Sequence, residues 1–381
     1  MSNFLNHIGI IGGGISGLAL GCSLRKFGIN TVIFEKEPNL HNEGAGISIS
    51  PNGLIALEYL DLKNELKKNS YKSSRAILKY NNSTLLEMES PVYTMNRKNL
   101  INILYKKYTD LGGEILFDLE LKDIEIEKKE LTFTNLLSIQ VKHIVASDGI
   151  KSLIRENFFS QGSKPIYSGY NAWRGFIKSN NPNVEISLSS NKHLVSYPID
   201  NELKRSFTGI IKSDKRITES WREQGNLETF IKQFEETNHQ IAKVFESAED
   251  IFKWGIFVRP PLKNIIKKNI TLIGDAAHPM VPFLGQGACI AIEDAYTFGY
   301  LCHELKCEFD NVQKMYQLLR IKRNNKIQKM SLNQGKLNHL KNPFLVFLRN
   351  QLMKKTDIVS KRLKNIHNYD VHEETIKSLT N

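Results

Sequence analysis

The hydrophobic positions at the start of the chain predict a strand, then a helix, then a second strand. Residues 7–11 form a short apolar run, and a glycine-rich turn follows them. The segment LALGCSLRKFG then predicts a helix that Gly28 closes, and residues 30–35 predict a second strand. This order is typical of a βαβ unit with parallel strands.

Two later apolar runs are expected to join the same sheet. Residues 143–146 predict a buried strand that leads into Asp148, and residues 270–273 predict another that leads into Gly274 and Asp275. In open α/β sheets, ligands bind beyond the carboxyl ends of the strands. Both acidic residues therefore stand where a ligand site is expected.

The middle and the end of the chain follow other patterns. Short alternating segments between Tyr167 and Val258 predict a mostly antiparallel sheet. Pro51-Asn52-Gly53 is interpreted as a turn after a short strand, whereas Arg97 is expected to begin an amphipathic helix. After Glu293 the chain is predicted to be helical to its end.

The first glycine-rich turn has the spacing of a dinucleotide-binding loop. Gly12 permits the tight turn, Gly14 leaves room for a pyrophosphate, and Gly17 lets the helix pack on the strand. The N-terminus of the helix then offers N–H groups to the phosphates. Glu35, 18 residues after Gly17, is placed to accept hydrogen bonds from a ribose. An acid there disfavours a 2′-phosphate, so the site predicts FAD or NAD.

The segment from Gly274 to Gly287 favours FAD. A strand, a proline-containing loop and Gly285-Gln286-Gly287 lead into a helix. Backbone N–H groups at such a helix start can face the anionic edge of a reduced flavin ring. A simple NAD dehydrogenase does not account for this second motif.

Composition and charge narrow the class of protein. The chain has 41% hydrophobic and 24% charged residues, which is typical of a globular protein. Its net charge of +12 allows a nucleic-acid-binding protein as a remote alternative. The lysines are spread along the chain without interleaved aromatic residues, so a solvated basic surface is the preferred interpretation.

The spacing of the cysteines bears on disulfides and metal binding, and the length of the apolar runs bears on the location of the protein. Four irregularly spaced cysteines do not predict a disulfide framework, and Cys302, His303 and Cys307 lack a second ligand pair, so no metal site is expected. No run reaches the roughly 18 apolar residues of a membrane-spanning helix, and no leader is recognised. A cytoplasmic protein, monomeric or homodimeric, is expected.

Three motifs together resemble a known family. They are GGGISG with Glu35, DGIKSLIR from Asp148 to Arg155, and GDAAHPMVP with GQG from Gly274 to Gly287. Their order resembles the group A FAD-dependent aromatic monooxygenases with the para-hydroxybenzoate hydroxylase fold. The segment YSGYNAWRG, residues 167–175, is most similar to the salicylate, hydroxynicotinate and urate hydroxylase branch.

The resemblance implies an α/β fold: a Rossmann-like FAD-binding domain (GR2 type), an inserted, mostly antiparallel β-sheet substrate domain and a helical C-terminus. The expected FAD-binding parts are residues 1–75, 97–165 and 263–310. The expected substrate-domain parts are the strands at 76–96 and residues 166–262, and C-terminal helices follow at 311–381. The helix from Pro343 is apolar on one side and basic on the other. It is expected to dock on the FAD-binding domain, with an interfacial membrane anchor as the alternative.

The family also implies the cofactors and the reaction. NADH or NADPH reduces FAD, and O₂ then supplies an oxygen atom to a small phenolic or heteroaromatic substrate through a flavin hydroperoxide. Glu35 would hold the ribose of FAD, and Arg97 its pyrophosphate region. Asp275 would bind its ribityl or pyrophosphate portion, and Asp148 would touch both FAD and the nicotinamide nucleotide. The expected cofactor-binding residues are Gly12, Gly14, Gly17, Glu35, Lys36, Gly46, Arg97, Asp148, Asp275, Pro282, Gly285, Gly287 and Ala288.

Candidate catalytic residues are His193, Tyr197 and Pro282, and the expected substrate-pocket residues are Trp173, Arg174, His193, Tyr197 and Phe283. His193 and Tyr197 are separated by an even step, so on one strand they face the same side. His193 is expected to deprotonate or orient a phenol, or else to lie on an exposed face of the sheet. Arg174 is expected to pair with a substrate carboxylate or to hold a domain junction. His278 is expected to be structural or to line the site.

Two further enzymes of the same fold stay open as alternatives. They are a hydroxylase of quinone biosynthesis and a drug-inactivating flavin monooxygenase. The sequence distinguishes neither the substrate nor NADH from NADPH.

Overall fold

The computed structural model of the chain describes residues 4–40, 45–159, 164–202, 204–215, 223–237 and 241–380. Within this part of the chain, a first sheet has the strand order β16, β17, β10, β1, β2, β6. Its strands are β1 (Ile8–Ile11), β2 (Thr31–Phe34), β6 (Glu114–Leu116), β10 (His143–Ala146), β16 (Ile266–Lys267) and β17 (Ile270–Leu272). All pairs are parallel except β16 with β17. The predicted parallel sheet is confirmed.

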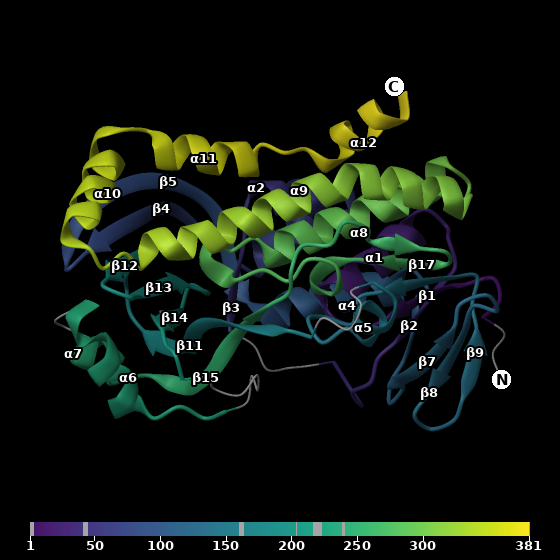
Figure 1. Ribbon diagram of the computed structural model, residues 1–381, viewed down its shortest axis with the longest axis horizontal. Coiled ribbons are helices and arrows are strands. Elements are labelled where there is room, and N and C mark those ends of the chain that lie inside the picture. The colour runs from purple at the N-terminus through teal and green to yellow at the C-terminus, as the bar shows by residue number, and fades with distance from the viewer. Residues whose placement is uncertain are drawn as a thin grey trace.

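Both faces of the first sheet are covered. Figure 1 shows the helices α8 (Gly287–Glu304) and α9 (Phe309–Asn338) above this sheet, and β7 (Leu121–Glu125), β8 (Glu130–Phe133) and β9 (Ser138–Gln140) below it. The ring of Phe34 in β2 lies 5.1 Å from the ring of Phe133 in β8, so the three-stranded sheet of β7, β8 and β9 packs on the first sheet. Every residue of β1, β2 and β10 is buried, because strands covered on both faces have no side open to water.

A second sheet has the order β15, β11, β14, β13, β12, β4, β5, β3. Its strands are β3 (Gly46–Ile49), β4 (Tyr71–Tyr80), β5 (Ser83–Asn96), β11 (Ile166–Lys178), β12 (Val184–Ser189), β13 (Lys192–Pro198), β14 (Lys204–Lys212) and β15 (Glu249–Val258). Only β12 and β4 pair in parallel. The predicted antiparallel sheet is therefore confirmed. The domain boundaries stay a prediction.

The two faces of the second sheet pack on different parts of the chain. On one face, Trp173 and Phe207 join aromatic residues of α6 (Leu227–Phe234) and α7 (Ile241–Phe245). On the other face, Ala172 and Ile210 pack against Val281, which lies in the segment leading to α8. This second face is therefore the one turned toward the predicted cofactor segment.

One local prediction is wrong. Pro51-Asn52-Gly53 is the first turn of a helix, α2 (Pro51–Tyr59), not an isolated turn. Proline is compatible with a first helical position because its missing N–H has no partner there. A Cβ on Gly53 would lie 2.7 Å from Sγ of Cys289, so glycine lets α2 pack closely on α8.

The remaining helices include those predicted after the first glycine turn, from Arg97 and at the C-terminus, together with two short helices, at 63–68 and 153–158, that were not predicted. They are α1 (Ile15–Lys26), α3 (Lys63–Lys68), α4 (Arg97–Asp110), α5 (Leu153–Phe158), α10 (Pro343–Lys355), α11 (Ile358–His367) and α12 (Val371–Thr380). Met353 of α10 packs against Leu78 and Leu85 of β4 and β5. The expectation that this helix docks on the FAD-binding part is therefore wrong, because its inner face is on the second sheet. In the described residues, no helix has the length and apolarity needed to span a membrane.

A buried ionic network joins α8 to α9. Asp294 Oδ1 accepts from Arg320 Nε at 2.7 Å, and Glu293 Oε2 accepts from Arg320 Nη2 at 2.8 Å and from Arg323 Nε at 2.7 Å. The side chains of Glu293, Asp294 and Arg320 are fully buried. Burial alone would raise the pKa of Asp294, but the neighbouring His278 and Arg320 outweigh it and lower the pKa. Asp294 is thus a charged carboxylate within the core.

Replacing Arg320 by Met is expected to lower the free energy of unfolding by about 3–5 kcal/mol, because two buried carboxylates lose a charged partner. Denaturant unfolding of the purified protein measures the change. Lys322→Met is the matched control, since Lys322 is exposed on the same helix. Equal effects of the two substitutions would contradict a specific role of the network.

Candidate active site

The glycine turn after β1 has the close contacts that the motif requires. Gly12 has φ of 103°, and a Cβ there would lie 2.7 Å from the carbonyl oxygen of Ser147. A Cβ on Gly17 would lie 2.0 Å from the carbonyl oxygen of Gly12. Around Gly14, in contrast, a Cβ would meet no atom within 4 Å. Gly14 therefore borders open space at the N-terminus of α1, where a phosphate is expected.

Glu35 ends β2 with its carboxylate held in place. Its Oε2 accepts from the amide of Gly13 at 2.6 Å, and its Oε1 accepts from the amide of Glu37 at 3.0 Å. Glu35 is buried. The acid is thus fixed beside the glycine turn, as binding of a ribose requires. The neighbouring Lys36 is exposed, with its Nζ 4.0 Å from Glu37.

Arg97 and Asp275 come together from distant parts of the chain. Arg97 begins α4, and Asp275 follows β17. Burial lowers the pKa of Arg97, and the nearby Asp275 opposes that change. The Asp275 side chain is exposed to solvent. The protein packed around it nevertheless desolvates the carboxylate and raises its pKa, while His278 and Arg97 oppose that rise. These two groups of opposite charge therefore lie near each other at the carboxyl end of the first sheet.

Asp148 presents an acceptor toward this region. Its Oδ2 accepts from the amide of Leu153 at 3.0 Å. Its Oδ1 is buried and has no hydrogen-bond partner in the described part of the chain. Burial raises the pKa of Asp148, and a hydrogen bond from Ser152 opposes that rise. An unpartnered buried oxygen is costly, so this atom fits a hydroxyl or amide donor of a ligand.

The segment before α8 is also expected to line the cofactor site. Pro282 is exposed, Gly285 has φ of 62°, and a Cβ on Gly287 would meet no atom within 4 Å. Gly287 begins α8, and Ala288, which follows it, is half-buried. The first amides of α8 are thus next to open space, as at Gly14.

Gly46 has a packing reason to be glycine. Its amide donates to Oγ of Ser206 at 2.9 Å, and a Cβ there would lie 2.4 Å from Cβ of Ser206 and 2.7 Å from the Tyr197 ring. The assignment of Gly46 to the cofactor stays a prediction.

Three features of the site together fit FAD. They are the open space at Gly14, the free oxygen of Asp148, and the neighbouring side chains of Arg97 and Asp275.

His193 and Tyr197 lie on the same face of β13. His193 pairs in register with Ile210, so it shares the face that packs on Val281. It is buried, and its ring lies 5.5 Å from the ring of Phe283. Burial raises the pKa of Tyr197, and a hydrogen bond from Ser206 opposes that rise. The structure therefore brings His193, Tyr197 and Phe283 to one side of the second sheet.

The partner of His193 is a second histidine from a distant part of the chain. Nδ1 of His193 lies 2.6 Å from Nε2 of His339, the residue that directly follows α9. Burial and then the neighbouring His339 lower the pKa of His193 well below 6.5. Burial lowers the pKa of His339 to about 4. No local pattern predicts this pair, because 146 residues separate its members.

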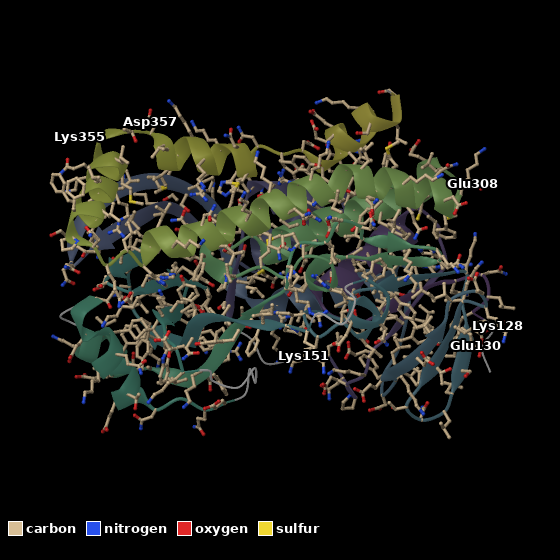
Figure 2. The ribbon with its side chains drawn as sticks, in the orientation of Figure 1. Lys128, Glu130, Lys151, Glu308, Lys355 and Asp357 are labelled. Carbon is tan, nitrogen blue, oxygen red and sulfur yellow. The ribbon has the colours of Figure 1, made fainter. Side chains whose placement is uncertain are left out.

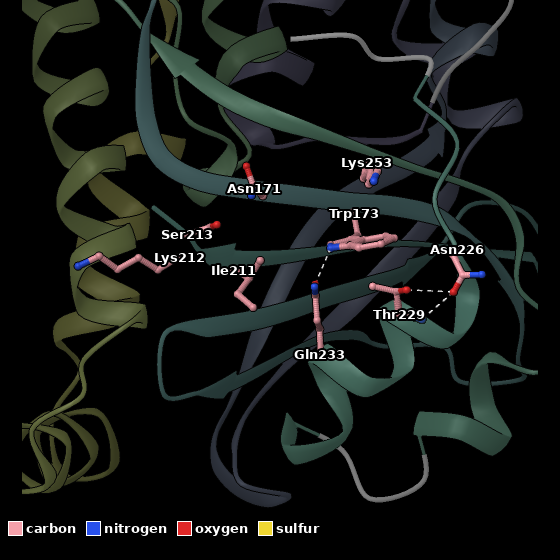
Figure 3. A pocket seen from close by; sticks show the side chains of 9 residues that line it. All are labelled: Asn171, Trp173, Ile211, Lys212, Ser213, Asn226, Thr229, Gln233 and Lys253. Atoms are coloured by element: carbon pink, nitrogen blue, oxygen red, sulfur yellow. Dashed lines mark hydrogen bonds between the residues drawn. The ribbon is translucent and has the colours of Figure 1, made fainter. Parts of the chain in front are cut away.

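Trp173 and Arg174 point to opposite faces of β11. Arg174 shares the face of His193, and its guanidinium lies 5.2 Å from the ring of Phe252 and 5.5 Å from that of Trp254. Trp173 lies on the other face, where its Nε1 donates to Gln233 at 2.9 Å. There it lines a separate pocket of about 200 Å³ (Figure 3). Trp173 is therefore not brought together with His193.

His278 is engaged within the core. Its Nε2 pairs with Oδ2 of Asp294, which also accepts from the amide of Gly274 at 3.1 Å. This imidazole therefore holds the loop that carries Asp275. In the described residues, no group of His, Cys, Asp and Glu side chains is arranged to hold a metal.

Comparison with known proteins gives the class. A family model described as an FAD binding domain matches residues 6–308, and the chain belongs to this family. The predicted FAD-dependent monooxygenase is confirmed. NADH or NADPH is the co-substrate typical of the family.

Individual relatives agree with this class. The chain is 28% identical over 361 residues to a 3-amino-4-hydroxybenzoate 2-monooxygenase of Streptomyces platensis, covering 89% of this chain and 90% of the relative. It is 24% identical over 353 residues to a 3-hydroxybenzoate 6-hydroxylase of Polaromonas naphthalenivorans, covering 87% of each. A salicylate hydroxylase structure superposes with a TM-score of 0.84 at 21% identity, covering 98% of both chains. The predicted fold class is confirmed by this superposition.

Replacing Gly14 by Val is expected to weaken FAD binding by at least about tenfold, because the new side chain occupies the space meant for a phosphate. Flavin fluorescence titration of the apoprotein measures the dissociation constant. Gly14 has φ of −76°, so valine is compatible with its backbone. An unchanged dissociation constant would contradict the assignment of this space to the cofactor.

Proposed function

We propose that this enzyme hydroxylates a phenolic carboxylic acid of the hydroxybenzoate type, with NAD(P)H and O₂. The observation that carries the proposal is the grouping of His193, Tyr197 and Phe283 on the face of the second sheet that packs on Val281. The relatives named for aminohydroxybenzoate and hydroxybenzoate support this substrate class.

The chain holds the cofactor from several segments. Gly14 and the N-terminus of α1 would receive the pyrophosphate, Glu35 would bind the ribose, and Arg97, Asp148 and Asp275 would bind the remaining polar groups. The chemistry that FAD would supply when bound is the transfer of two electrons from NAD(P)H to O₂, with one oxygen atom passing to the aromatic ring and the other leaving as water. The protein would exclude water and orient the substrate, and Pro282, which is exposed before α8, would border both the cofactor and the ring.

His193 acts as the base. It is uncharged at neutral pH because burial lowers its pKa. If its Nδ1 carries the hydrogen and donates it to Nε2 of His339, then Nε2 of His193 is left to accept the phenolic proton. Deprotonation makes the ring more electron-rich, which favours attack on an electrophilic oxygen. His339 is thus a positioning residue that selects the tautomer of His193.

Location and assembly complete the proposal. The four cysteines are free thiols, which agrees with a cytoplasmic, reducing location. The assembly is proposed to be a monomer or a homodimer. Neither the family nor the fold favours the nucleic-acid-binding alternative.

The purified protein is expected to be yellow and to oxidise NAD(P)H faster when a hydroxybenzoate or an aminohydroxybenzoate is added. Absorbance of NAD(P)H and chromatography of the product measure this. Benzoate without a hydroxyl group is the control, because it has no phenolic proton to lose. A colourless protein that FAD does not reconstitute contradicts FAD binding, whereas a yellow protein without any effector contradicts only the hydroxylation.

His193→Gln is expected to lower kcat by about 10²–10⁴-fold, because the base is lost. His339→Gln is expected to lower kcat less and to raise the pH at which activity falls on the acid side, because His339 no longer lowers the pKa of His193. Steady-state pH profiles measure both effects. His303→Gln, an exposed histidine of α8, is the control. Unchanged pH dependence in His339→Gln would contradict its coupling to His193.

A further inference from the structure

The outer face of α10 is apolar and uncovered. Phe344 is 66% exposed, Phe347 56% and Leu352 53%. Leu345 and Leu348 lie on the same side of the helix and are also exposed. Large apolar side chains are ordinarily scattered singly over a protein surface, so five on one short helix indicate a binding face.

The opposite face of α10 is firmly packed. Met353 contacts the second sheet, and the guanidinium of Arg349 lies 5.1 Å from the ring of Tyr80. Arg349 also donates to the carbonyl oxygen of Leu337 at 2.9 Å, and the Asn342 side chain caps the first turn. The helix is therefore held with its apolar side outward, and inward rotation would break these contacts.

The chain segment that carries this face is strongly basic. Between residues 336 and 364 the only acid is Asp357. The exposed cations of this segment are Lys336, Lys341, Lys354, Lys355, Lys361 and Lys364. Figure 1 places α10 at one end of the long axis, and Figure 2 shows Lys355 and Asp357 at that end.

We propose that α10 binds the surface of an anionic lipid bilayer. Its phenylalanines and leucines would enter the boundary between headgroups and acyl chains, and the lysines would contact the lipid phosphates. At 13 residues the helix is too short to span a bilayer, so it lies in the plane of the surface.

A second copy of the chain fits this face less well. Two basic segments would face each other across a twofold axis, which is unfavourable for association. A stable dimer also needs about 20–30 residues on each side, more than one short helix provides. Charge and size therefore both favour the bilayer.

The test is co-sedimentation of the full FAD-loaded protein with vesicles. The protein is expected to bind vesicles of phosphatidylcholine mixed with phosphatidylglycerol, and to bind phosphatidylcholine vesicles at least about tenfold less. The double variant Phe344→Ser with Phe347→Ser is expected to lose binding to the mixed vesicles by more than about tenfold. Lys354→Glu with Lys355→Glu is expected to weaken binding and to remove most of its salt dependence.

The control is Leu136→Ser with Leu318→Ser, which removes two exposed leucines elsewhere and should leave binding unchanged. FAD content and the melting temperature check that each variant is folded. Binding to neither kind of vesicle, or equal binding by the phenylalanine variant, overturns the proposal. So does a dimer in light scattering that this variant converts to a monomer, because a second copy would then cover the face. None of these outcomes depends on hydroxylation.

Discussion

The buried carboxylates of Glu293 and Asp294 are the constraint on which the site depends. Buried charges are tolerated only when they are fully paired, so every partner must dock in one arrangement. Asp294 binds the amide of Gly274 and also Arg320, while Glu293 accepts from Asn52 at 2.7 Å. The network therefore links the loop carrying Asp275 to α2, α8 and α9. Loss of one partner would leave a charge unpaired in the core and free the loop beside the cofactor.

The site also depends on close packing of helices at two glycines, Gly53 and Gly335. This packing involves the same helices that the buried carboxylates join. Gly53 lets α2 pack on α8, beside the glutamate that Asn52 reaches. Near the far end of α9, a Cβ on Gly335 would lie 2.2 Å from the ring of Phe283. This contact brings the end of α9, with His339, up to the second sheet. The same helix thus stabilises the cofactor loop at one place and contacts the proposed base at another.

The second sheet separates structural from catalytic side chains by the alternation of its strands. One face is filled by Trp173 and the aromatic residues of α6 and α7, and the other presents His193 and Tyr197. A step of one residue reverses the face, and for this reason Trp173 and Arg174 have different surroundings although they are adjacent. A resemblance that points to both residues does not reveal which of them faces the cofactor.

The parallel sheet, the glycine turn with Glu35 and the helix from Arg97 were predictable from the sequence because each rests on local spacing. Gly12, Gly14 and Gly17 act within one turn, and apolar runs predict buried strands wherever they occur. The proximity of Arg97 to Asp275 and the contact of His193 with His339 involve residues more than a hundred positions apart. Such contacts depend on how the two sheets and α9 pack. The apolar face of α10 was visible in the sequence, but only the packing of its other face on the second sheet decided that it points outward.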